Sequence, residues 1–353
     1  MRNIAFDVLN DVNEKKIFVN LRLKDLDSNN CDINNITIRV YGVLQNYNFL
    51  EYKVLETTKD KKIDHKTKLI LMMAIFEKMF LDNTPEYAII SEYTNLAARK
   101  NQKAKKFISY YLNNVLDEAV NAYPKFKNQE KNESIIYSMP QWIVKKIKLQ
   151  YKDDYLQILE SMNKKKNISA RVINKLSKPE EFESFLFPDL VRCKTNIIKT
   201  NDFEEKNILI QDVGSYLITK YLKPIESDMV LDMCAAPGNK TLHIAENCKF
   251  IYANEINEKR FELLKKNTKD KKNIEVLNCD ATSKNMLDFE LKDVKFDKIL
   301  IDAPCSGWGV FRSKPEMKIY QNSMEVSEII KVQKQILRNA INYLAPGGEI
   351  VYS

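Results

Sequence analysis

One short stretch restricts the possible folds of this chain more than any other, residues 230–241 with the sequence VLDMCAAPGNKT. An apolar run ends in an acid at Asp232, a tight turn around Gly238 follows, and an amphipathic segment begins at Lys240. This is the strand–turn–helix corner at which open α/β sheets bind nucleotides, outside the carboxyl ends of their strands. The turn has one glycine, whereas a dinucleotide fingerprint has three so that the backbone can approach a pyrophosphate. The stretch therefore predicts an α/β domain that binds a nucleoside cofactor without phosphates, and an ordinary strand–helix turn is the alternative.

Further apolar runs follow at the spacing of an alternating α/β domain. The strands that we expect are residues 229–233, 250–254, 274–278, 298–301 and 349–353. A helix with one apolar face precedes the last of them, between residues 326 and 344, and Pro346-Gly347-Gly348 marks a turn. Such an order predicts a Rossmann-like parallel sheet.

Three of these strands end in an acid, at Glu255, Asp280 and Asp302. An acid at the tip of the second strand can accept hydrogen bonds from both ribose hydroxyls, and an acid after the third can reach the exocyclic amine of an adenine. A helix-capping role is the alternative for Glu255. S-adenosylmethionine is the phosphate-free nucleoside cofactor that fits this pattern.

The loop after the fourth strand, Asp302-Ala303-Pro304-Cys305-Ser306-Gly307, indicates the reaction. Enzymes that methylate an exocyclic amine tend to place an aromatic residue where Cys305 stands. Carbon 5 of a pyrimidine is too weak a nucleophile to take a methyl group directly, but a thiolate that adds at carbon 6 makes it reactive. Cysteine in this loop therefore favours methyl transfer to carbon 5 of a pyrimidine, with Cys305 and Asp302 as catalytic residues.

The first part of the chain has a different character. Only Gly42 precedes residue 200, and the net charge of +8 arises entirely in those 200 residues. Apolar residues recur at helical spacing through residues 1–122, which predicts helices. Residues 69–80 are so apolar all round that they should form a central, buried helix. Five basic residues precede a further helix at 107–119, namely Arg99, Lys100, Lys103, Lys105 and Lys106. They could neutralise RNA phosphates, although a solvated charged face explains them equally well.

The intervening sequence completes the domain prediction. Residues 123–139 are polar and are expected to be a linker, and 140–210 a basic connecting subdomain that faces RNA and includes Arg171. Residues 211–353 then form the catalytic domain. No apolar run approaches the ~20 residues that cross a bilayer, and no signal peptide is evident. The six cysteines have no metal-binding or disulfide spacing, so we expect no metal site and a cytoplasmic location.

Together these motifs resemble the RNA 5-methylcytosine methyltransferases. The helical part resembles the RNA-binding NusB family, through RVYGVL at 39–44 and NNVL at 113–116. With both parts, essentially the whole chain is similar to the bacterial 16S rRNA cytosine-C5 methyltransferase B family. The resemblance implies an all-α NusB-like domain followed by an α/β, Rossmann-like class I methyltransferase domain. It also implies 16S ribosomal RNA, free or in an early small-subunit particle, as the partner of a monomeric enzyme. The cofactor that the resemblance implies is S-adenosylmethionine, bound by Cys234, Ala235, Ala236, Pro237, Gly238, Asn239, Lys240, Glu255, Asp280 and Asp302.

The chain departs from the family pattern in two places. Asn239 replaces the second glycine of the turn, which is tolerable where that backbone is not left-handed. The family's nucleophile lies in a Thr-Cys pair directly after the fifth strand, where this chain ends at Ser353. The resemblance therefore implies that Cys305 assists product release, that the nucleophile lies beyond Ser353, and that the last two strands of a seven-stranded sheet are missing. We expect the chain to be the first part of a longer enzyme.

Two other functions compete with this interpretation. A non-catalytic RNA-binding factor could keep the methyltransferase fold as a scaffold, and its mark would be lost affinity for S-adenosylmethionine. A DNA cytosine-C5 methyltransferase would use the thiol of Cys305 itself as nucleophile. The N-terminal position of the extra domain argues against the DNA enzyme.

Overall fold

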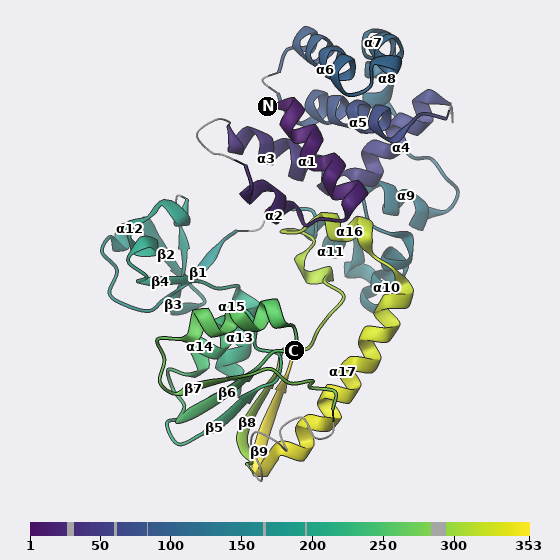
Figure 1. Ribbon diagram of the computed structural model, residues 1–353. Coiled ribbons are helices and arrows are strands. Elements are labelled where there is room, and N and C mark those ends of the chain that lie inside the picture. The colour runs from purple at the N-terminus through teal and green to yellow at the C-terminus, as the bar shows by residue number, and fades with distance from the viewer. Residues whose placement is uncertain (27–31, 60–61, 83, 165–166, 195, 284–293) are drawn as a thin grey trace. The chain divides into compact units, whose positions relative to one another are not determined.

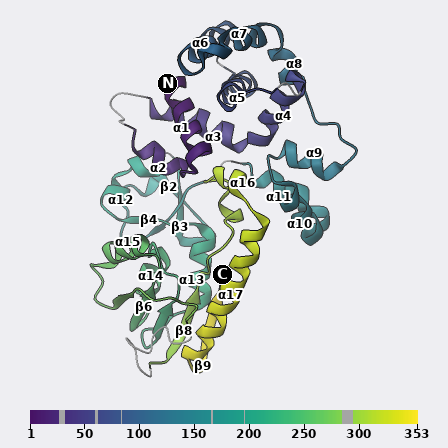
Figure 2. The same ribbon diagram turned by 45° about the vertical axis from the view of Figure 1, so that its right-hand side comes forward.

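The computed structural model describes residues 1–26, 32–59, 62–82, 84–164, 167–194, 196–283 and 294–353 (Figures 1 and 2). The chain divides into two compact units. The helical unit comprises Met1–Lys166 and Gly307–Ser323, and the sheet unit comprises Asn167–Ser306 and Met324–Ser353. Within the described ranges, no helix combines the length and the apolar character that a membrane span requires.

The helical unit is built around one buried helix, α5 (His65–Phe80). Asp64 caps this helix by accepting a hydrogen bond from the Thr67 backbone N–H at 3.1 Å. Residues 69–75 are fully buried, as the sequence predicts, because other helices pack around α5 (Figure 1). These helices are α1 (Arg2–Lys15), α3 (Ile33–Gln45), α4 (Tyr47–Thr58), α6 (Glu86–Lys100), α7 (Lys105–Asn114) and α8 (Leu116–Asn121). The helix expected at 107–119 is thus two helices that meet at Val115.

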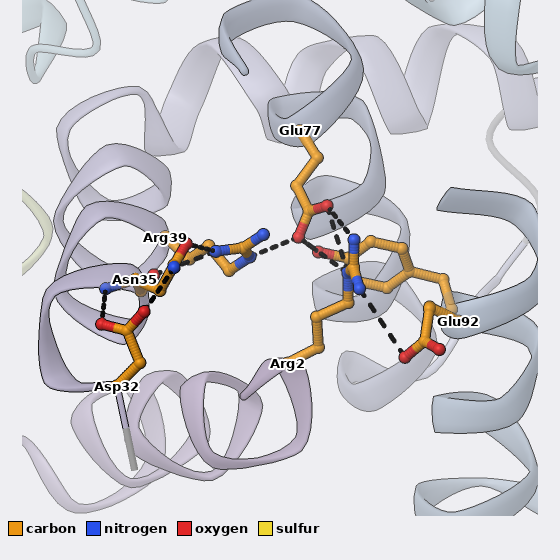
Figure 3. A network of polar contacts seen from close by, with 7 residues as sticks. Arg2, Asp32, Asn35, Arg39, Glu77 and Glu92 are labelled. Carbon is orange, nitrogen blue, oxygen red and sulfur yellow. Dashed lines mark hydrogen bonds and ion pairs between the residues drawn. The ribbon is translucent and has the colours of Figure 1, made fainter. Parts of the chain in front are cut away.

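Glu77, near the end of α5, lies within this core with a fully buried side chain (Figure 3). Its carboxylate accepts three hydrogen bonds from Arg2, at 3.0, 3.1 and 2.7 Å, and one from Arg39 Nε at 2.5 Å. The Tyr93 hydroxyl donates a further bond at 2.7 Å. Buried charges require such compensation, so Glu77 links α1, α3 and α6 to α5.

The helical unit continues beyond the expected boundary at residue 122. The segment expected to be a linker contains α9 (Gln129–Ile136), and buried Ser138 accepts a hydrogen bond from the Phe49 backbone N–H at 3.1 Å. α10 (Gln141–Tyr151) and α11 (Tyr155–Ser161) follow, and with α9 they enclose a separate apolar cluster around Ile143. Part of the basic connecting subdomain therefore belongs to the helical unit.

The sheet unit contains a five-stranded parallel sheet in the order β7-β6-β5-β8-β9. The strands are β5 (Met229–Asp232), β6 (Phe250–Asn254), β7 (Ile274–Leu277), β8 (Phe296–Ile301) and β9 (Leu344–Tyr352). Each coincides with an expected strand to within a few residues except β9, which begins earlier. The expected turn at Pro346-Gly347-Gly348 lies within β9 as a bulge. The pairing of β9 with β8 shifts its register there, since Phe296 pairs with Leu344 and Lys298 pairs with Glu349.

Alternate residues of the central strands face opposite layers of helices. Leu231 and Ile299 pack with Ile336 of α17 (Ser323–Tyr343) on one face. Val230 and Leu300 pack on the other face against α13 (Val213–Leu222) and α14 (Asn239–Ile244). α15 (Glu258–Thr268) covers the same side through Leu264, which packs on Ala253 of β6. Figure 1 shows the two layers, which are typical of a doubly wound α/β fold.

A second, antiparallel sheet precedes this domain, in the order β2-β3-β1-β4. Its strands are β1 (Ser169–Val172), β2 (Phe182–Phe185), β3 (Phe187–Cys193) and β4 (Ile208–Ile210). Together with α12 (Asn201–Glu204), these strands enclose an apolar cluster that includes Ala170, Val191 and Ile208. The expected subdomain at 140–210 is therefore divided, with its helices in the helical unit and its strands in the sheet unit.

Candidate cofactor and catalytic site

The carboxyl edge of the five-stranded sheet carries the predicted acids. Asp232 is the last residue of β5, Glu255 and Asp302 directly follow β6 and β8, and Asp280 lies shortly after β7. The chain proceeds outward from β5 through β6 to β7 and then returns to the other side of β5 with β8. Because crevices open where the strand order reverses in this way, a ligand site is expected beside the ends of β5 and β8.

Side chains from β6 and α15 hold the turn between β5 and α14. The buried amide of Asn254 donates to the carbonyl oxygens of Met233 and Cys279, at 3.1 and 3.0 Å, and accepts from the Cys279 N–H at 2.8 Å. Arg260 Nη2 donates to the carbonyl oxygen of Ala236 at 2.6 Å. Asn254 is not among the predicted site residues, although a polar residue at a strand end, directly before the predicted acid, is a signal that the sequence contains.

Gly238 has a backbone conformation that suits glycine alone, with φ at +107°. A Cβ atom there would also lie 3.0 Å from Leu264 Cδ1. Asn239 is already the first residue of α14, a right-handed helix. The condition under which asparagine can replace the family's second glycine is therefore met.

Asp232 is almost completely buried beneath this turn. Its Oδ2 accepts a hydrogen bond from the Thr241 hydroxyl at 2.8 Å, whereas its Oδ1 has no hydrogen-bond partner among the described residues. Burial raises the pKa of Asp232 to about 7, and the nearby Asp302 carboxylate adds to the increase. An unpartnered buried oxygen is costly, so this atom is suited to receive a donor from a ligand.

Lys240 and Asp302 form an ion pair at the same place, with Nζ and Oδ2 2.6 Å apart. Beside this pair lies a cavity of about 150 Å³. It is lined by Asp212, Ser215, Asp232, Cys234, Ala235, Ala236, Pro237, Asn239, Lys240 and Asp302. The structure thus brings together most of the predicted cofactor residues and adds Asp212 and Ser215, which begin α13 and had no assigned role.

Glu255 and Asp280 do not line the cavity. Glu255 is buried, and its two oxygens engage the Asn257 N–H at 2.9 Å and Arg260 Nη1 at 3.2 Å. Each carboxylate oxygen can accept a second bond, so Glu255 keeps acceptor capacity. Asp280 is exposed and accepts bonds from the backbone and hydroxyl of Thr282 at 2.8 and 2.7 Å.

The two thiols of the site have different surroundings. Cys234 lies in the turn, where burial, together with the carboxylates of Asp232 and Glu255, raises the pKa of its thiol to about 12. Such a thiol stays protonated and unreactive at neutral pH. Cys305 is exposed in the loop after β8. Gln333 of α17 donates to the carbonyl oxygen of Pro304 at 2.9 Å and so supports this loop.

The basic cluster of the helical unit is only partly available to a ligand. Arg99, Lys103 and Lys106 are exposed and Lys105 is half-buried. Lys100 forms an ion pair with Asp7, with Nζ 2.6 Å from Oδ1, so part of its charge is already neutralised.

The position of Arg171 differs from the expectation that this residue faces RNA. Its side chain is buried in β1 of the sheet unit and only 3% exposed. The guanidinium donates to Glu246 at 2.6 and 2.8 Å and to Gln211 Oε1 at 3.1 Å. Arg171 therefore does not face RNA, because its hydrogen-bonding groups are used inside the protein.

Comparisons with known proteins agree with this description. Residues 219–353 match the model of the family described as 16S rRNA methyltransferase RsmB/F, and residues 1–132 match that of the NusB family. A Bacillus subtilis (strain 168) protein named "Probable ribosomal RNA small subunit methyltransferase B" is 27% identical over 100% of this chain and 84% of its own length. The "Ribosomal RNA small subunit methyltransferase B" of Proteus mirabilis (strain HI4320) is 26% identical over 100% and 87%.

Two solved structures share the fold. "Crystal Structure of PH0851" superimposes with a TM-score of 0.74 at 22% identity and covers 99% of this chain and 85% of that one. A "Methyltransferase Homolog Protein from Pyrococcus Horikoshii" gives a TM-score of 0.53 at 22% identity, over 64% and 77% of the two chains.

The reversed strand order, the Gly238 turn and the acids of the carboxyl edge define a Rossmann-like methyltransferase domain, here joined to a NusB-like helical domain. The chain thus combines a domain that matches the NusB family with a domain that matches the 16S rRNA methyltransferase RsmB/F family. The predicted family and fold class are thereby confirmed.

Proposed function

We propose that this protein transfers a methyl group from S-adenosylmethionine to carbon 5 of a cytosine in 16S ribosomal RNA. The observation that carries the proposal is the set of carboxylates at the ends of neighbouring parallel strands, around a turn that accommodates no side chain at Gly238. The proposal also includes a cytoplasmic, monomeric enzyme that acts on 16S RNA, free or in an early small-subunit particle.

The residues of the site fit the cofactor. Asp302 and the unpartnered Oδ1 of Asp232 suit the amino group of its methionine part, because both lie at the cavity and a carboxylate attracts an ammonium group. Glu255 keeps acceptor capacity for the ribose hydroxyls, and exposed Asp280 for the adenine amine. When bound, the cofactor supplies an electrophilic methyl group.

The thiol of Cys305 has a role in the base chemistry. Methylation at carbon 5 requires a thiolate to bond to carbon 6, which places an electron pair on carbon 5. After methyl transfer, a base removes the proton from carbon 5 and the sulfur–carbon bond breaks. We assign Cys305 to this release, and the attacking thiol to a second cysteine.

Methyl transfer tests the assignment of the thiols. If Cys305 serves release, an enzyme that carries the second cysteine should still attack the base after Cys305→Ala. Covalent protein–RNA adducts should then accumulate on a denaturing gel. Methyl transfer by residues 1–353 alone, abolished by Cys305→Ala, would instead assign the nucleophile to Cys305.

RNA is proposed to contact the exposed basic residues Arg99, Lys103 and Lys106 of the helical unit. The affinity of the whole chain for 16S RNA should then fall steeply with salt, since phosphate neutralisation releases counterions. Substitution of these three residues by glutamine should flatten that dependence. An unchanged salt slope would remove them from the interface.

Calorimetric titration with S-adenosylmethionine tests the cofactor site directly. Asp280→Ala and Glu255→Ala should each weaken binding by about 1–3 kcal/mol, the range for hydrogen bonds to a charged group. Glu275→Ala is the matched control, because this exposed residue lies within β7 and away from its carboxyl end. Unchanged affinity in both site variants would refute the assignment.

A further inference from the structure

The segment that follows the catalytic loop belongs to the helical unit, although it lies between two parts of the sheet unit in sequence. The chain leaves the sheet unit after Ser306 and returns to it at Met324. The intervening residues contain the short helices η5 (Trp308–Val310) and α16 (Glu316–Tyr320). This crossing begins at Gly307, two residues after Cys305.

Apolar contacts hold the first half of this segment. Phe311 is fully buried among Met139, Ile143 and other members of the cluster formed by α9–α11. Trp308 packs against Trp142 of α10 and donates a hydrogen bond to Gln321 at 3.0 Å. Burial of a phenylalanine side chain is strongly stabilising, so this half is firmly attached.

Buried polar groups hold the second half. Lys318 is only 4% exposed, and its ammonium donates to the carbonyl oxygen of Gln45 at 3.0 Å and to Asn163 Oδ1. Lysine is rarely buried to this extent. Burial lowers its pKa to about 7, but the amine can donate in either form.

Two neighbours of Lys318 complete this attachment. Fully buried Glu316 accepts a hydrogen bond from the Val19 backbone N–H at 3.2 Å. The Tyr320 hydroxyl donates to the carbonyl oxygen of Val12 at 2.5 Å. The short helix α16 is therefore bound to α1, α2 (Val19–Lys24) and α3 at once.

We propose that residues 307–323 are a tether through which the helical unit positions the Cys305 loop, with Lys318 as the positioning residue. Cys305 and Gly307 are two residues apart and cannot separate by more than about 7 Å. A tether fixed in the helical unit therefore limits where the thiol can lie. The helical unit then acts on the chemical step as well as on RNA affinity. The kinetic consequence of this inference rests on the proposed function. Its structural consequence, the positioning of the Cys305 loop, does not.

Two variants of the whole chain test the tether. Lys318→Met keeps the length of the side chain and removes its hydrogen bonds, and Tyr320→Phe removes only a hydroxyl, so it stays informative where the first variant unfolds. Lys334→Met is the matched control, since Lys334 is an exposed residue of α17. Amide hydrogen exchange at residues 303–306 should accelerate by about tenfold in the tether variants, because their local opening costs less. The alkylation rate of Cys305, followed by mass spectrometry of its peptide, should change in parallel.

Kinetics separate positioning from simple stability. In an enzyme competent for methyl transfer, Lys318→Met should lower kcat by about tenfold or more, since small displacements of reacting groups are costly. KM for S-adenosylmethionine and the affinity for 16S RNA should stay within about twofold of wild type. Faster exchange within 307–323, with unchanged exchange at 303–306 and unchanged Cys305 alkylation, would overturn the proposal. Failure to bind S-adenosylmethionine would refute the proposed function alone, because exchange and alkylation need no cofactor.

Discussion

Glu77 supports a quantitative prediction about what holds the helical unit together. Its carboxylate is fully buried and receives hydrogen bonds from Arg2, Arg39 and Tyr93 (Figure 3). Glu77→Gln replaces one acceptor oxygen by an NH₂ group. That group would face the donors of Arg2 and leave two guanidinium groups without their counter-charge.

The expected magnitude follows from the surroundings of the two arginines. Loss of one partner of a buried ion pair costs about 3–5 kcal/mol. Arg2 is 18% exposed and keeps Glu92 at 3.6 Å. Arg39 keeps two hydrogen bonds to Asn35, at 3.1 and 2.8 Å. These remaining contacts place the expected loss at the lower end of the range, about 3 kcal/mol.

Urea unfolding followed by tryptophan fluorescence measures this loss selectively, because both tryptophans of the chain, Trp142 and Trp308, belong to the helical unit. Glu92→Gln is the matched control. Glu92 is 55% exposed, and exposed pairs contribute only about 0–1 kcal/mol. A Glu77→Gln variant that unfolds within about 1 kcal/mol of wild type, or no more easily than the control, would refute the reasoning.

The effect should also depend on pH. Burial alone would raise the pKa of Glu77, but the hydrogen bonds from Arg2, Arg39 and Tyr93 outweigh it and lower the pKa below its ordinary value. The stabilisation is therefore fully present above the unfolded-state pKa of about 4.3, and it is lost as the pH falls through the lower pKa of the folded state. The difference between wild type and Glu77→Gln should shrink in that range.

Three further outcomes are expected. Gly42→Ala should destabilise the helical unit by about 1–3 kcal/mol in the same fluorescence assay, because its Cβ would lie 2.0 Å from Phe76 Cζ. Arg171→Gln should lower the melting temperature of the sheet unit by removing the pair with Glu246, while the salt slope of RNA binding stays unchanged; a flatter slope would restore Arg171 to the RNA surface. Burial, assisted by the charges of Arg171 and Lys220, lowers the pKa of His243 to about 3, so its NMR signals should not titrate between about pH 5 and 8. Because the unfolded chain takes up that proton first, the sheet unit should lose stability as the pH falls below about 6.5.

The sequence by itself determined the features that depend on local order. The apolar runs, the acids directly after them and the lone glycine of the turn identify β5–β8 and their carboxyl edge, because parallel strands bring their ends to one edge. The all-round apolar character of residues 69–80 likewise identifies α5, since only a surrounded helix can bury every side.

Only the tertiary structure decided which side chains are paired and which are free. In the sequence, Arg171 is one basic residue in a basic segment. In the structure it is paired with Glu246, which lies 75 positions further along the chain. Lys100 is paired with Asp7, and Lys318 is buried against Gln45 and Asn163, in a segment that the order of residues assigns to the other domain. Periodicity reports the burial of neighbours along one element. Ion pairs and buried amines depend on where distant elements meet, which no local pattern contains.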